Sequence, residues 1–165
     1  MNYKDRDDMK SIKYLVMDVD GTLTDGKIYM GNDGEVMKAF NIKDGCGIRE
    51  IAICAGIEPI IITARESRIL ERRCHELGIK SVYQRVPNKI EKLKEIIKEY
   101  NQVAYIGDDI NDLASMHFIK DAGGVIGCPK DAVKNVIKIA DFVSEFNGGD
   151  GAVRDFIEWL VDEKK

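Results

Sequence analysis

Short apolar runs rich in β-branched residues alternate with segments of helical periodicity along this chain, and no other feature of the sequence restricts the fold as strongly. The run YLVM at 14–17 is apolar at every position, which is typical of a strand buried on both faces. Further strands are expected at 59–62, 81–83, 103–106, 124–126 and 142–143. Helices are expected at 46–55, 67–77, 89–100, from about 112, after 131, and at 152–161. The alternation predicts an α/β fold with a doubly wound, Rossmann-like, mostly parallel sheet and helices on both faces.

One segment interrupts this alternation. Residues 27–40 contain two short strand-like pieces around GNDGE, and this turn chemistry predicts a small β-hairpin insert. A chain of 165 residues without an internal repeat or a low-complexity tract is expected to fold as a single domain, residues 1–165.

The charge balance and the cysteines argue against several classes of function. With 25 basic and 29 acidic residues, a net charge of −4 and no basic run, the chain gives no reason to expect nucleic acid or a membrane as a partner. The N-terminus lacks the apolar core of a signal peptide, and no apolar run is long enough to span a bilayer, so we expect a cytoplasmic protein. The four cysteines form no CxxC pair, so neither a structural zinc site nor a disulfide framework is expected.

Polar residues gather where the expected strands stop. Asp18 and Asp20 follow the strand at 14–17, and Thr63 follows the strand at 59–62. The strand at 103–106 is followed by Asp108, Asp109 and Asp112, and Lys89 opens the helix at 89–100. Because the carboxyl ends of parallel strands meet at one rim of a sheet, these side chains should converge there. A lone DxD pair or a lone lysine is more often a cap or a solvated residue, but the joint placement favours a functional site.

Five carboxylates at one rim raise one another's pKa unless a cation compensates their charge. All-oxygen ligands in a small, open site suit Mg²⁺. The metal and Lys89 would then hold an anion with phosphate-like oxygens, to which Thr63 and the amides after Asp20, Gly21 among them, can donate hydrogen bonds. The arrangement predicts phosphoryl chemistry, with Asp18 as the nucleophile that forms an aspartyl-phosphate and Asp20 as the general acid and base.

The motifs DVDGTLTDG, IIITAR and GDDINDL, together with Lys89, resemble in type and order those of the haloacid dehalogenase superfamily, in its phosphatase branch. The resemblance implies the same catalytic and phosphate-binding roles. The Mg²⁺ ligands that it implies are the Asp18 carboxylate, the Asp20 main-chain carbonyl and Asp108, supported by Asp109 and Asp112. The true dehalogenases lack the second aspartate of the first motif, so Asp20 argues against that chemistry.

The spacing of the motifs resembles that of the members without a cap domain. Residues 24–58 leave room only for a hairpin and a helix, and residues 64–88 only for a helix and a short strand. An open site of this kind suits a large substrate, or else it requires closure by another subunit.

Longer stretches resemble a narrower family, the 3-deoxy-D-manno-octulosonate 8-phosphate phosphatases. These stretches are DGKIYMGNDGEVMKAFNIKDGCGI, ITARESRILERRCHELGI and GGDGAVRDFIEWL. The resemblance implies a small-molecule substrate, a phosphorylated eight-carbon 2-keto sugar acid used in lipopolysaccharide synthesis. It also implies a homotetramer whose hairpins pack together and whose neighbouring chains help to form the site.

Phosphatases of nine-carbon, sialic-acid-type 9-phosphates share nearly all of these motifs and form the nearest alternative. Arg65 favours the octulosonate family, because some nine-carbon enzymes carry a glutamate there. Two residues depart from the pattern: Arg85, where the family usually has glycine, and Asp150, where octulosonate enzymes often have arginine. The choice between the two substrates therefore stays open on the sequence.

A sugar acid carries a carboxylate besides its phosphate, and a guanidinium matches a carboxylate through two parallel hydrogen bonds. Arg65 and Arg73 are the candidates for this contact, and Asp44 is a weaker candidate for sugar hydroxyls. The alternative for Arg73 is a surface position at which it pairs with Glu76.

A phosphoacceptor signalling domain is the alternative from a different class, because it also combines an acidic metal site with Thr and Lys on a doubly wound sheet. In that architecture, paired acids follow the first strand and the acceptor aspartate follows the third. Here nothing acidic follows Tyr83 directly, and Asp20 supplies a turnover group that a stable phosphorylated switch would not need.

Overall fold

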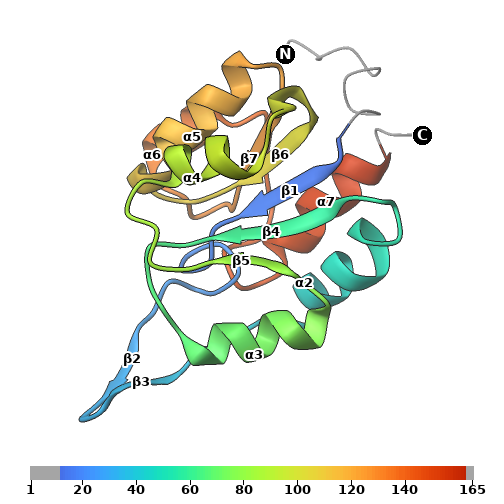
Figure 1. Ribbon diagram of the computed structural model, residues 1–165. Coiled ribbons are helices and arrows are strands. Elements are labelled where there is room, and N and C mark those ends of the chain that lie inside the picture. Colours follow the sequence, from blue (N-terminus) through green and yellow to red (C-terminus); the bar gives the residue numbers. More distant parts are fainter. Residues whose placement is uncertain (1–11, 163–165) are drawn as a thin grey trace.

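In a computed structural model of the protein, which describes residues 12–162, the main strands form one six-stranded sheet in the order β5-β4-β1-β6-β7-β8 (Figure 1). Every neighbouring pair in this sheet is parallel. The strands are β1 (Tyr14–Met17), β4 (Glu58–Ile62), β5 (Ser81–Tyr83), β6 (Val103–Ile106), β7 (Val125–Cys128) and β8 (Phe142–Val143). The predicted fold class is confirmed.

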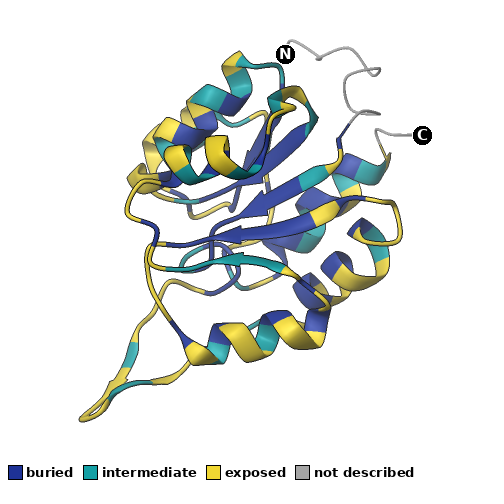
Figure 2. Ribbon diagram, in the orientation of Figure 1, coloured by how far each residue is buried: buried dark blue, intermediate teal, exposed yellow. Residues whose placement is uncertain are grey.

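Helices cover both faces of the sheet. One face carries α2 (Ile42–Cys46), the π-helix η1 (Gly47–Ala52), α3 (Arg68–Leu77) and α7 (Ala152–Asp162). The other face carries α4 (Lys89–Ile96), α5 (Ile110–Asp121) and α6 (Lys134–Ile139), and the 3-10 helix η2 (Tyr100–Gln102) precedes β6. Successive residues of β1 pack into opposite cores: Leu15 and Met17 on the α7 side, Val16 on the α5 side. This two-sided burial is why the strand is apolar at every position, as the burial colours in Figure 2 show.

Helix caps place the residues that open α3, α4 and α5. The Ser67 hydroxyl accepts from the Leu70 amide at the start of α3, and the Asn88 side chain accepts from the Glu91 amide at the start of α4. Asp109 caps α5 in a capping box with Asp112. The caps of α4 and α5 adjoin the rim, because Asn88 directly precedes Lys89 and Asp109 pairs with Asp112.

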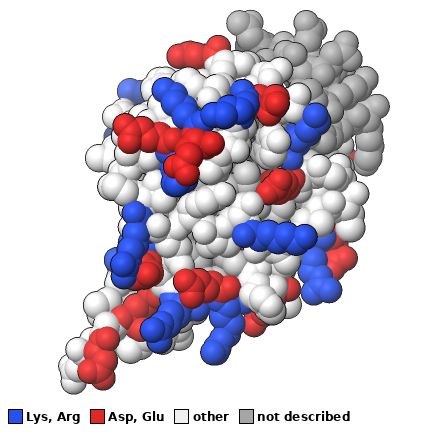
Figure 3. Space-filling view, in the orientation of Figure 1, with Lys and Arg blue, Asp and Glu red and all other residues white. Residues whose placement is uncertain are grey.

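The predicted hairpin is present as β2 (Tyr29–Gly31) and β3 (Gly34–Met37), and it projects away from the body of the protein (Figure 1). Its surface is unusually apolar for an exposed segment: Met30 and Val36 are each 63% exposed, and Ile28 and Met37 are also exposed. Charged side chains of both signs are interspersed elsewhere on the face shown in Figure 3.

Two helices differ from the prediction. The helix expected at 46–55 is instead α2 followed by η1, and it begins at Ile42 because the Asn41 side chain accepts from the Lys43 amide. Its two early glycines have low helix propensity, but Gly47 lets the helix approach α7, where an added Cβ would lie 2.8 Å from Arg154 Cδ. The helix expected at 89–100 ends at Ile96; residues 97–99 are not helical, and Tyr100 begins η2.

The remaining elements begin or end within two residues of the prediction, as is usual for helix termini. Within residues 12–162, no helix combines the length and the apolar character that a membrane span requires.

Candidate active site

The parallel register brings the ends of three strands to one level. Met17 of β1 pairs with Ile61 of β4 on one side and with Ile106 of β6 on the other. The Asp18 amide then donates to the Ile106 carbonyl at 3.1 Å, which extends the pairing by one residue. The segments that begin at Asp18, Thr63 and Gly107 therefore start side by side, as the strand-end argument predicts.

Lys89 lies at the centre of this rim. Its ammonium is 2.7 Å from Asp18 Oδ1 and 2.8 Å from Asp112 Oδ1, and the residue is only 4% exposed. Burial disfavours the charged form, but the two carboxylates outweigh it and hold the pKa of Lys89 above its ordinary value. The rim therefore contains a permanent cation at the first residue of α4.

Asp112 holds the loop after β6 in place. Its Oδ1 also accepts from the Tyr105 hydroxyl at 2.8 Å, and its Oδ2 accepts from the backbone amides of Asp108 and Asp109 at 3.2 and 3.3 Å. Because Asp112 is fully buried, these donors replace the water that its charge would otherwise need. Asp109 uses its own Oδ1 to cap the Ile110 amide, so its side chain serves the helix start.

Three carboxylates of the rim can hold a metal ion. One ligand atom each from Asp18, Asp108 and Asp112 lies within 4.8 Å of the others, and Thr22 Oγ1 orients Asp108 by donating to it at 2.9 Å. Burial, and then the charge of Asp112, raise the pKa of Asp18 to about 6 against the opposing effect of Lys89. Burial and the charge of Asp18 raise the pKa of Asp108 to about 7. One ammonium does not balance three carboxylates, so this all-oxygen donor set fits a divalent cation such as Mg²⁺.

The loop after Asp18 is a tight turn around the carbonyl of Val19, which accepts from the amides of Thr22, Leu23 and Thr24. Gly21 adopts a φ of +98°, and an added Cβ would overlap the Asp108 carboxylate. The Gly21 amide lies 3.4 Å from Thr24 Oγ1. The loop thus lies directly against Asp108, one of the carboxylates that could hold a metal.

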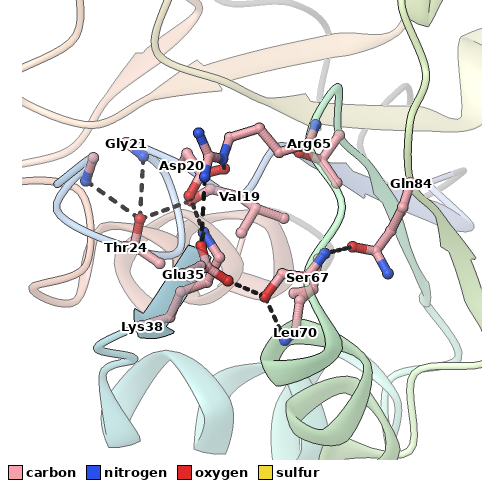
Figure 4. Close-up of polar contacts among 12 residues, drawn as sticks. Val19, Asp20, Gly21, Thr24, Glu35, Lys38, Arg65, Ser67, Leu70 and Gln84 are labelled. Carbon is pink, nitrogen blue, oxygen red and sulfur yellow. Dashed lines mark hydrogen bonds and ion pairs between the residues drawn. The ribbon is translucent and has the colours of Figure 1, made fainter. Parts of the chain in front are cut away.

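A second cluster surrounds Asp20 at the base of the hairpin (Figure 4). Asp20 Oδ1 forms an ion pair with Lys38, which follows β3, and Asp20 Oδ2 lies 3.6 Å from Arg65 Nε. Glu35 of β3 lies 3.1 Å from Lys38 Nζ and 3.6 Å from Arg65 Nη2, and it accepts from the Ser67 hydroxyl. Burial alone would raise the pKa of Glu35, but the contacts with Ser67 and Lys38 have a larger opposite effect and hold this pKa below its ordinary value.

Lys38 and Glu35 are absent from the residues that the sequence singles out. The hairpin reverses the usual pattern, because its apolar side chains are exposed while Lys38 is buried. A charged residue in a short hairpin normally faces solvent, so the only available signal is the apolar character of its neighbours Met37 and Ala39.

The remaining candidates lie in different places. Thr63 is buried at the end of β4, where its Oγ1 accepts from the Arg65 amide at 3.4 Å. Arg73 lies 3.3 Å from Glu76 on α3, and Asp44 accepts from the Arg154 amide at 2.8 Å, at the start of α7. These contacts direct Arg73 and Asp44 towards α2, α3 and α7 and not towards Asp18, but they leave Arg73 Nε and Asp44 Oδ2 buried without a hydrogen-bond partner among the described residues.

Comparison with known proteins identifies the family. No family model matches the chain. The 3-deoxy-D-manno-octulosonate 8-phosphate phosphatase KdsC of Escherichia coli K12 is 41% identical over 156 residues, which cover 92% of this chain and 80% of that protein. The chain belongs to this phosphatase family, within the haloacid dehalogenase superfamily. It is therefore a hydrolase of the phosphatase class, and the predicted resemblance is confirmed.

Solved structures of the family have the same fold. The cobalt-bound deoxy-D-mannose-octulosonate 8-phosphate phosphatase of Haemophilus influenzae has a TM-score of 0.86 at 33% identity, with 95% of this chain and 91% of that chain covered. The 3-deoxy-D-manno-octulosonate 8-phosphate phosphatase of Moraxella catarrhalis, in complex with magnesium, phosphate and a KDO molecule, also has a TM-score of 0.86 at 33% identity, with 96% and 90% covered.

Proposed function

We propose that the protein is a Mg²⁺-dependent phosphomonoesterase that releases phosphate from 3-deoxy-D-manno-octulosonate 8-phosphate through an aspartyl-phosphate on Asp18. The observation that carries the proposal is the rim, where Asp18 contacts Lys89 and lies beside Asp108 and Asp112. The magnesium, phosphate and KDO found together in the Moraxella relative support the choice of metal and substrate.

Asp18, as the carboxylate, attacks phosphorus, and the bond between phosphorus and the sugar oxygen breaks. Asp20 gives its proton to the leaving sugar oxygen and then takes a proton from the water that hydrolyses the aspartyl-phosphate. Lys89, Thr63 and the Gly21 amide hold the phosphate oxygens, and Arg65 binds the carboxylate of the sugar acid.

Mg²⁺ would be held by the carboxylates of Asp18, Asp108 and Asp112 and by the Asp20 carbonyl, and when bound it neutralises charge on the transferring phosphate. With a pKa of about 6, Asp18 is largely ionised at neutral pH, and the positive charge of a bound Mg²⁺ would lower this pKa further.

The proposal includes a cytoplasmic homotetramer in which hairpins of neighbouring chains pack together. It is supported by the exposed apolar side chains of the hairpin, because exposed apolar surface of this kind favours a protein contact.

Phosphate release from octulosonate 8-phosphate, measured with and without Mg²⁺ beside the nine-carbon 9-phosphates, tests the proposal. We expect multiple turnovers only with metal, and loss of turnover in Asp18→Asn but not in the control Asp121→Asn, which changes an exposed aspartate of α5. Release of a single equivalent of the sugar, with the phosphoryl group retained on the protein, would instead indicate a phosphoacceptor domain. A preference for nine-carbon substrates by tenfold in kcat/KM, about 1.4 kcal/mol, would overturn the substrate assignment.

A further inference from the structure

Lys38 is a buried cation with no place in the phosphoryl-transfer machinery described so far. Its side chain is only 2% exposed, although it belongs to a hairpin whose other residues are largely exposed. A buried ammonium is costly unless carboxylates compensate it, and Lys38 is compensated by Asp20 and Glu35. The fold thus brings this lysine from the hairpin to the proton-transfer residue.

Glu35 fixes the position of the Lys38 ammonium. It is itself held by the hydroxyl of Ser67, the residue that caps α3 through the Leu70 amide. The Ser67 amide in turn donates to the Gln84 side chain at 2.7 Å (Figure 4). Lys38 is therefore anchored through Glu35 to the start of a core helix and does not depend on the hairpin alone.

The two oxygens of Asp20 have different surroundings. Oδ1 is bonded directly by Lys38, whereas Oδ2 faces Arg65 Nε at 3.6 Å, which is too long for a hydrogen bond. Arg65 is also far more exposed than Lys38, with 42% of its side chain accessible. The carboxylate is thus held firmly by Oδ1, whereas Oδ2 has no hydrogen-bond partner among the described residues.

We propose that Lys38 is a positioning residue for Asp20, which holds Oδ1 and thereby presents Oδ2 to the leaving sugar oxygen. The inference rests on the proposed function, because it needs Asp20 to be the general acid. A general acid works only when its proton is aimed at the leaving atom, and a side chain fixed in advance avoids losing its rotational freedom during the reaction.

The test compares two leaving groups in Lys38→Met. A sugar alkoxide needs a proton as it leaves, whereas the nitrophenolate of p-nitrophenyl phosphate leaves without one. The ratio kcat/KM reports the steps up to the first phosphoryl transfer, so it isolates the role of the acid. We expect Lys38→Met to lower kcat/KM by about a hundredfold for octulosonate 8-phosphate and to leave that for p-nitrophenyl phosphate nearly unchanged.

Three further variants and a control separate positioning from a structural role. Asp20→Asn should give the same selective loss, and Lys38→Met added to Asp20→Asn should lower the sugar-phosphate value little further, because both changes remove one function. Lys38→Arg, which keeps the cation, should recover part of the loss. Lys134→Met, which changes an exposed lysine of α6, is the matched control and should alter neither substrate.

An equal loss for both substrates in a folded Lys38→Met protein would overturn the inference, and so would a loss confined to KM for the sugar phosphate. If Lys38→Met does not fold, Lys38→Gln carries the same comparison. Failure of the proposed function has a different signature, namely turnover that survives Asp18→Asn. If the wild-type protein prefers a nine-carbon phosphate, that substrate replaces the octulosonate in the same comparison.

Discussion

Two buried lysines hold the two aspartates of the first motif, and their surroundings differ in charge. At the rim, Lys89 stands among three carboxylates, those of Asp18, Asp108 and Asp112. At the hairpin base, Lys38 and Arg65 face two carboxylates, those of Asp20 and Glu35, so the charges balance. The first cluster needs another cation and the second does not.

The difference suits the different roles proposed for Asp18 and Asp20, which are only two residues apart. Burial, and then the charge of neighbouring carboxylates, raise the pKa values of Asp18 and Asp108 at the rim, whereas contacts with Ser67 and Lys38 lower that of Glu35 below its ordinary value despite burial. A rim with excess negative charge favours a metal and a nucleophile, and a balanced cluster favours a carboxylate that is oriented by its neighbours.

Replacing Lys89 by Met should have the largest effect, because it leaves three buried carboxylates without a cation. We expect kcat/KM to fall by about a hundredfold or more for both octulosonate 8-phosphate and p-nitrophenyl phosphate. The free energy of unfolding without metal should fall by about 3 kcal/mol in a urea titration. A loss confined to the sugar phosphate would mean that the two lysines have the same role, which would contradict the comparison.

The stability of the metal-free protein should depend on pH through the rim. A carboxyl whose pKa is higher in the folded state contributes stability that is complete below its unfolded value of 3.8 and is lost as pH rises through about 6 for Asp18 and about 7 for Asp108. Thermal unfolding should therefore show a decrease in stability on the order of 2 kcal/mol between pH 5 and pH 8, and Mg²⁺ should restore more of it at pH 8.

Asp108→Asn should flatten this pH dependence. Glu35→Gln should not, because the lowered pKa of Glu35 places its contribution at more acidic pH. A flat profile in the wild-type protein would show that the rim carboxylates do not hold their protons as the geometry implies.

Gly21→Ala in the loop after β1 and Gly34→Ala in the hairpin compare how the rim and the hairpin respond to a side chain at a glycine with positive φ. Both glycines have a positive φ, so alanine should cost each about 1–2 kcal/mol in a urea titration. Only at Gly21 would the new Cβ also overlap Asp108, whereas no atom lies within 4 Å of it at Gly34. Gly21→Ala should therefore also weaken Mg²⁺ binding and activity. Equal effects on Mg²⁺ affinity would contradict the contact between this loop and the metal ligands.

The smallest effect on the folded chain should come from the tip of the hairpin. Met30→Lys combined with Val36→Lys should change the free energy of unfolding by less than about 0.5 kcal/mol, because both side chains are exposed. In sedimentation velocity, the same change should dissociate the proposed tetramer. Ile53→Lys, at an exposed apolar residue outside the hairpin, is the control and should leave the assembly intact.

Much of the rim could be predicted because it depends on short-range patterns. Strands such as β1 and β6 are buried on both faces and therefore stand out as continuous apolar runs, and the parallel topology gathers whatever follows them. Lys89 is recognisable for the same reason, since it opens a helix with clear periodicity. The partners of Asp112, by contrast, include Tyr105, whose side chain direction only the folded sheet reveals.

The hairpin base could not be predicted in the same way. Lys38 reaches Asp20 across 18 residues only because the hairpin folds back over the first loop. For Arg73 and Asp44, the sequence could not show that they contact Glu76 and the start of α7 in the folded chain, and their predicted role in binding a sugar acid stays a prediction.

The four residues of β1 also limit which insertions and deletions the enzyme can tolerate during evolution. Because alternate residues face opposite cores, inserting or deleting a single residue within Tyr14–Met17 would turn the apolar side chains to the wrong faces and carry Asp18 away from Lys89. Side chains in the loops on either side of the rim do not alternate between two cores, so these loops can lengthen by any number of residues. Relatives of this chain should therefore vary in length between the motifs and hardly at all within the strand that leads to Asp18.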